Sequence, residues 1–143
     1  MKIGNPTGKT VEELQMRLSG TYPGTKIRKT FFGIGPNNLI VPFENFKHVI
    51  RPIKKGSVLV ADFIPPVYIT VLAIVLGIAA AFVMAFIVIS MGGNYTIGGV
   101  LWMLIVLLIL KYFFKSKNKE KFDKFYSDLN LAIMGSSEPG SLF

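Results

Sequence analysis

Hydrophobic residues are concentrated in the middle of the chain, in two runs that stand close together. The first run, Val67 to Met91, contains no charged side chain. As a helix it would measure about 37 Å, which exceeds the roughly 30 Å thickness of bilayer hydrocarbon. The second run, Ile97 to Leu110, follows after the short segment Gly92 to Thr96. This pattern predicts a membrane helical hairpin, with spans at about residues 67–91 and 97–114.

The sequence before the first run predicts a small α+β unit over residues 1–64. Thr10 and Glu13 have the T-x-x-E spacing of a capping box, and the apolar positions after Thr10 predict a helix over residues 11–19. Beyond it, short apolar segments are separated by turn residues such as Gly, Pro and Asn. The expected strands are residues 26–32, 38–43, 46–53 and 57–63. The short breaks between them favour an antiparallel meander.

A helical pattern returns after the second run, within residues 115–143. Its apolar positions fall on one stripe, which consists of Phe122, Phe125, Tyr126, Leu129 and Ile133. We therefore expect an amphipathic helix that lies against the membrane surface, followed by a flexible tail. The predicted fold class is a membrane α-helical hairpin (two transmembrane helices over residues 65–114) with a small N-terminal cytoplasmic α+β domain and a C-terminal amphipathic helix.

The charge pattern predicts an orientation. The chain has a net charge of +8, from 16 basic and 8 acidic residues. Residues 1–66 carry ten basic and four acidic groups, residues 111–143 carry six and four, and the predicted hairpin loop carries none. By the positive-inside rule, both termini of this multi-pass protein lie in the cytoplasm, and the spans lie in the cell (inner or plasma) membrane.

No motif in the sequence predicts an enzyme. The segment from Gly4 to Thr10, GNPTGKT, resembles a phosphate-binding P-loop but is one residue short, with no strand expected before it. His48 is the sole histidine, the chain has no cysteine, and the carboxylates are scattered. These residues favour neither a metal site nor acid–base catalysis. We expect no cofactor and no nucleic acid, and we identify no small-molecule substrate.

Two features favour interaction with a membrane and its proteins. Ala73, Gly77, Ala81 and Ala85 repeat every four residues, and this small-xxx-small strip predicts close helix packing, either within the hairpin or against a partner helix. Basic residues flank the two apolar runs and predict contact with anionic phospholipid. The expected lipid-contact residues are Lys54, Lys55, Lys111, Lys115, Lys117, Lys121 and Lys124.

These observations favour a non-catalytic role. The spans lack ionisable groups, and the soluble unit is small for independent stability. We therefore expect an accessory, anchoring or assembly subunit of a larger membrane protein complex, with other integral membrane proteins as partners. One alternative is a homo-oligomeric membrane-active or pore-forming small protein. A second alternative is a regulatory membrane anchor that binds anionic lipid.

Overall fold

The computed structural model describes residues 1–30, 35–94 and 98–135. The chain divides into two compact units. The first, which we call the sheet unit, comprises Met1–Ile64 together with Glu120–Phe143. The second, the helical unit, comprises Pro65–Lys119. The apolar middle of the sequence therefore interrupts one folded unit, whose two parts come from opposite ends of the chain.

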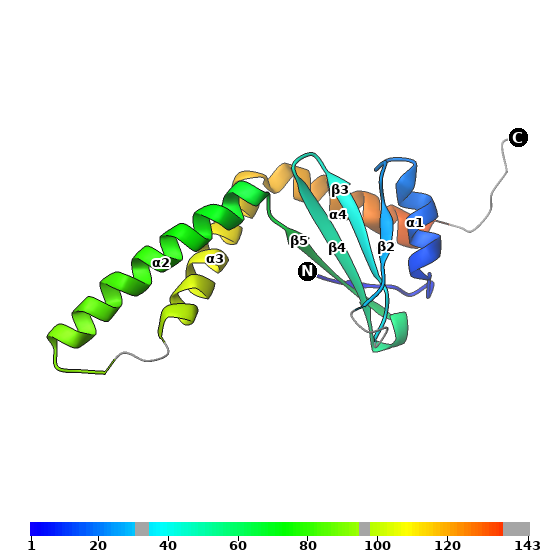
Figure 1. The fold of residues 1–143 in the computed structure, drawn as a ribbon. Coiled ribbons are helices and arrows are strands. Elements are labelled where there is room, and N and C mark those ends of the chain that lie inside the picture. Colours follow the sequence, from blue (N-terminus) through cyan, green and yellow to red (C-terminus); the bar gives the residue numbers. More distant parts are fainter. Residues whose placement is uncertain (31–34, 95–97, 136–143) are drawn as a thin grey trace, which may run out of the picture. The chain divides into compact units, whose positions relative to one another are not determined.

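The sheet unit contains a five-stranded antiparallel sheet with the strand order β1-β5-β4-β3-β2 (Figure 1). The strands are β1 Lys2–Gly4, β2 Lys26–Arg28, β3 Asn38–Phe43, β4 Phe46–Ile53 and β5 Val58–Ile64, and a 3-10 turn, η2 (Lys54–Gly56), joins β4 to β5. Strands β2 to β5 form a meander, as the short breaks predict. Strand β1, which the sequence analysis missed, pairs with the outer side of β5.

Four of the sequence predictions extend into parts of the chain outside the described residues. The strand expected over residues 26–32 is described only to residue 30, and β2 ends at Arg28. Residues 95–96 of the expected hairpin loop, residue 97 of the expected second span and residues 136–143 of the expected tail also lie outside the description.

Helix α1 (Val11–Ser19) begins at the capping box that the sequence predicts. The Glu13 N–H donates to the Thr10 hydroxyl at 3.3 Å, and the Thr10 N–H donates to the Glu13 carboxylate at 2.8 Å. These bonds satisfy two of the amide groups that the first helical turn leaves without an intrahelical partner. The apolar side of α1, including Leu14 and Leu18, is buried in the sheet unit.

The C-terminal helix α4 (Lys119–Met134) corrects the predicted fold class. Its apolar stripe packs on the sheet: the Phe122 ring stacks on Phe46, and the Phe125 ring lies parallel to the His48 imidazole at 3.6 Å between centroids. The prediction of a separate N-terminal domain and of a C-terminal helix on the membrane surface is therefore wrong. The stripe was identified correctly, but its spacing does not say what covers it, and the neighbouring lysines suggested lipid.

The helical unit corrects the second part of that prediction. Helix α2 (Val67–Ser90) is the one helix in the described part of the chain that is long and apolar enough to cross a membrane. Helix α3 (Gly98–Lys117) packs along α2 but carries Lys111, Lys115 and Lys117 in its last two turns. Its uncharged part, Gly98 to Leu110, measures roughly 20 Å, about two thirds of the hydrocarbon thickness. The two-span membrane hairpin is therefore also wrong.

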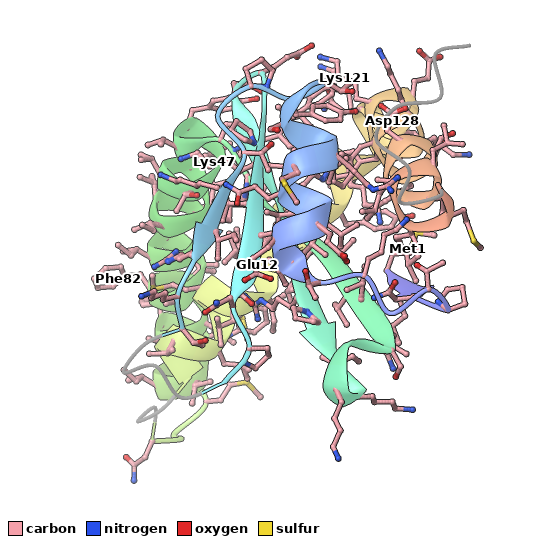
Figure 2. The ribbon with its side chains drawn as sticks, turned by 90° about the vertical axis from the view of Figure 1, so that its right-hand side faces the viewer. Met1, Glu12, Lys47, Phe82, Lys121 and Asp128 are labelled. Atoms are coloured by element: carbon pink, nitrogen blue, oxygen red, sulfur yellow. The ribbon has the colours of Figure 1, made fainter. Side chains whose placement is uncertain are left out.

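Helices α1 and α4 lie on the same face of the sheet. Tyr22, shortly after α1, makes an edge contact with the Phe125 ring of α4, and the Thr7 hydroxyl donates to the Ile133 carbonyl. Because side chains alternate along a strand, Lys47 lies on the opposite face from Phe46 and His48. Figure 2 shows Lys47 and Asp128 of α4 on opposite sides of the sheet. Within the described sheet unit, no helix covers the Lys47 face.

Candidate functional site

Helix α2 exposes large apolar side chains along most of its length. Phe82 and Phe86 are 73% and 74% exposed, and Val75, Ile78 and Ile89 are also exposed (Phe82 is labelled in Figure 2). Only Ala73 and Gly77 are buried among the residues of α2. A helix that is apolar on every side is stable where lipid or another protein covers it, because water does not solvate this surface favourably.

The small-xxx-small strip of α2 faces α3. Ala73 and Gly77 are buried, and Ala81 and Ala85 are half-buried. A β-carbon at Gly77 would lie 2.7 Å from the Met103 Cα, so the two backbones approach too closely for any larger residue. Gly77 thus packs against α3 within the chain, and packing of the strip against a partner helix stays a prediction.

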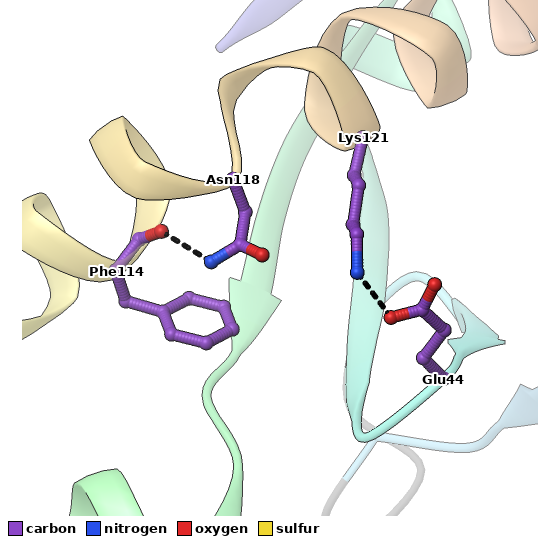
Figure 3. A network of polar contacts seen from close by, with 4 residues as sticks. All are labelled: Glu44, Phe114, Asn118 and Lys121. Carbon is purple, nitrogen blue, oxygen red and sulfur yellow. Dashed lines mark hydrogen bonds and ion pairs between the residues drawn. The ribbon is translucent and has the colours of Figure 1, made fainter.

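The lysines expected to contact lipid lie in different parts of the structure. Lys54 and Lys55 belong to η2, where both have positive φ angles and exposed side chains. The three on α3 follow its apolar part, and Lys124 is exposed on α4. Lys121 forms an ion pair with Glu44, which lies in the turn between β3 and β4 (Figure 3). The charge of Lys121 is therefore partly neutralised within the sheet unit.

Asn118 separates α3 from α4. Its side-chain amide and its backbone N–H both donate to the Phe114 carbonyl, at 2.9 and 3.1 Å (Figure 3). The Phe114 carbonyl thus accepts both the helical bond from the Asn118 N–H and a second bond from its side chain, and such local side-chain bonds to the backbone are typical of asparagine at helix ends.

The P-loop-like segment has a structural role. The Asn5 side chain donates to the Lys9 and Gly56 carbonyls and accepts from the Lys9 N–H, which holds the segment against the start of β5. The Lys9 ammonium donates to the Gly135 carbonyl, and the Thr10 N–H donates to the Glu13 carboxylate. The groups that would bind a phosphate in a P-loop are engaged elsewhere. Contrary to our expectation, strand β1 does precede the segment.

His48 is enclosed by aromatic rings. Its side chain is 0% exposed and is surrounded by Phe43, Phe46, Phe122 and Phe125. A substrate in solvent has no access to this imidazole, so His48 acts as a core residue. Among the described residues, no group of three or more His, Cys, Asp or Glu side chains is arranged to hold a metal ion.

Tyr22 links the two helices of the sheet unit. Its hydroxyl donates to the Asp128 carboxylate at 2.6 Å, and burial together with this bond raises the pKa of the Tyr22 phenol above its usual range. An unfolded tyrosine ionises near pH 10, so the unfolded state loses its proton before the folded state does. The stabilisation that the protonated Tyr22 phenol contributes to the folded state is fully present below about pH 10 and is lost as the pH rises further.

We expect Tyr22→Phe to lower stability by about 1–2 kcal/mol at neutral pH, because one hydrogen bond to a carboxylate is lost. The same change should make stability less sensitive to alkali. Because of Tyr22 alone, the free energy of unfolding of the wild type should fall by about 1.4 kcal/mol for each pH unit above pH 10. Urea unfolding at pH 8, 10 and 11 measures both effects. Parallel losses in the two proteins above pH 10 would contradict the role of Tyr22.

The uncovered face of the sheet holds a basic hollow that the sequence analysis missed. It has a volume of about 260 Å³, and its polar lining includes Arg28, Lys29, Asn38 and Arg51. Arg28, Asn38 and Arg51 belong to β2, β3 and β4, Lys29 follows β2, and the adjacency of these residues depends on strand register. The density of cations in residues 26–55 was the available sequence signal, but it did not show which of them meet.

No family model matches the chain, and no curated protein or solved structure matches it.

Proposed function

We propose that this protein is a non-catalytic accessory, anchoring or assembly subunit of a larger membrane protein complex. The observation that carries the proposal is the exposed apolar surface of α2, on which Phe82 and Phe86 are about three-quarters exposed. Helix α3 covers one strip of α2, so the remaining surface requires lipid or the apolar helices of a partner. The buried position of the sole histidine supports a non-catalytic role.

The sheet unit favours an arrangement in which both chain termini lie in the cytoplasm. Its two parts, which precede and follow the apolar segment, pack into one core and must therefore lie on the same side of a membrane. The excess of basic over acidic residues in these parts favours the cytoplasmic side.

Purification from cells at native expression level, in a mild detergent, tests this proposal. We expect a fixed set of larger integral membrane proteins to co-purify in constant ratio, as measured by mass spectrometry and native size. A variant with Phe82→Ala and Phe86→Ala removes two exposed aromatic rings from α2, and these membrane proteins should no longer co-purify with it. Recovery of the chain alone or as a homo-oligomer would contradict the proposal and favour the membrane-active alternative.

A further inference from the structure

The sheet face that carries no helix of its own unit is strongly basic. Side chains alternate between the two faces of a strand, so the uncovered face consists of the residues next in sequence to the helix-covered ones, together with their cross-strand partners. The exposed cations on that face are Lys2, Lys26, Arg28, Lys47 and Arg51, against a single carboxylate, Asp62. The positive charge is therefore concentrated on one side of the sheet.

The register of the strands brings two arginines toward a common point. Arg28 pairs with Asn38, and the pairing of Leu39 with Ile50 places Asn38 beside Arg51. Neighbouring strands lie about 4.8 Å apart, so the Arg28 and Arg51 backbones are separated by roughly 10 Å. Two arginine side chains can meet above Asn38 across this distance.

The hollow described above lies at this point. Its lining combines the two arginines with Lys29 and the Asn38 side chain, while the buried residues Ile40 and Val49 also contribute apolar surface. The five-donor guanidinium groups, an ammonium and an amide provide many hydrogen-bond donors around a small volume. Asp62 is the one acid in the lining, and its carboxylate accepts a hydrogen bond from the Phe63 N–H at 2.8 Å.

Among the described residues that line the hollow, three cations face the single carboxylate of Asp62, so the hollow keeps a net positive charge. Within residues 1–30, 35–94 and 98–135, the Arg28, Lys29 and Arg51 side chains form no ion pair and no hydrogen bond. Like charges at this spacing repel one another, and an anion between them would remove the repulsion. Guanidinium groups match the geometry of phosphate oxygens and bind them through paired hydrogen bonds.

We propose that the hollow between Arg28 and Arg51 is a binding site for a phosphate group. The two guanidinium groups hold the phosphate oxygens from opposite sides, Lys29 adds a third positive charge, and the Asn38 amide donates from below. The phosphate belongs either to a small soluble ligand or to a lipid headgroup. This proposal does not depend on membrane assembly, because the site lies entirely within the sheet unit.

Titration of the purified full chain in an uncharged detergent tests the site. The probes are inorganic phosphate and a short-chain phosphatidic acid, with phosphatidylcholine of the same chain length as the reference lipid, all at constant ionic strength. Calorimetry should show saturable binding of at least one phosphate probe. The double variant Arg28→Gln, Arg51→Gln should raise the Kd at least about tenfold, because it removes both guanidinium groups.

The matched control is Lys47→Gln, Lys119→Gln, which removes the same charge from two exposed positions that do not line the hollow. It should change the Kd less than about twofold. All substituted side chains are exposed, and near-UV circular dichroism confirms that each variant is folded. Much tighter binding of phosphatidic acid than of inorganic phosphate would assign the site to a lipid headgroup, and comparable binding would assign it to a soluble phosphate. Absence of saturable binding, or an equal loss in the control, would overturn the proposal.

Discussion

Replacing Phe125 by alanine is expected to lower the free energy of unfolding of the sheet unit by about 3–5 kcal/mol. The Phe125 side chain is fully buried, and its ring contacts both the His48 imidazole and the Tyr22 ring. Truncation leaves a cavity where α4 meets β4, and this cavity disrupts the contact that joins the two ends of the chain. The total free energy of unfolding of a small unit is roughly 5–15 kcal/mol, so this loss is a large fraction of its stability.

Urea unfolding of the full chain, followed by near-UV circular dichroism of the aromatic cluster, measures this effect. Lys124→Ala is the matched control, because Lys124 precedes Phe125 on α4 but is exposed. It should change stability by less than about 0.5 kcal/mol. If α4 instead lay on a membrane surface, Phe125→Ala would weaken lipid binding and leave the unfolding of the sheet unit unchanged.

The second large effect is expected from charges on α2. Ile78 and Phe82 are both exposed near the middle of the helix, one turn apart. At the centre of a bilayer each lysine costs about 2.5–3.5 kcal/mol, so the double variant Ile78→Lys, Phe82→Lys should lose about 5–7 kcal/mol of membrane affinity. We expect most of the protein to move from the membrane fraction to the soluble or aggregated fraction.

Alkaline carbonate extraction and sedimentation measure this redistribution. The matched control, Asn45→Lys with Ser57→Lys, adds the same charge at exposed positions of the sheet unit and should stay in the membrane fraction. Retention of the α2 variant in the membrane fraction, at the level of the control, would mean that α2 does not lie in bilayer hydrocarbon.

The sequence predicted those elements whose signals are local. The capping box at Thr10 and Glu13 specified the start of α1, and the Glu44-Asn45 turn separated β3 from β4. Strand β1 has only three residues, and it is formed through its pairing with β5, which lies more than 50 residues away. A segment this short carries no periodicity of its own, so its conformation depends on tertiary contacts.

The remaining errors concern what each apolar surface packs against. The stripe of α4 and the strip of α2 were both recognised from their spacing, but a spacing does not identify its partner. The structure places Phe125 on His48 and Gly77 against Met103. The phosphate site was missed for a related reason: Arg28 and Arg51 are 23 positions apart, and only the strand register brings them together.

The division of the sheet unit into two sequence segments has a consequence for synthesis. Residues 1–64 leave the ribosome first, but the aromatic core is complete only when α4 has followed, about 70 residues later. At about 5–20 residues per second this delay lasts roughly 4 to 14 seconds. During it, the apolar α2 is available for insertion while the sheet still lacks its C-terminal helix. With α2 in a membrane, as proposed above, its insertion precedes completion of the sheet unit, and a chain that terminates before α4 would be anchored without a finished core.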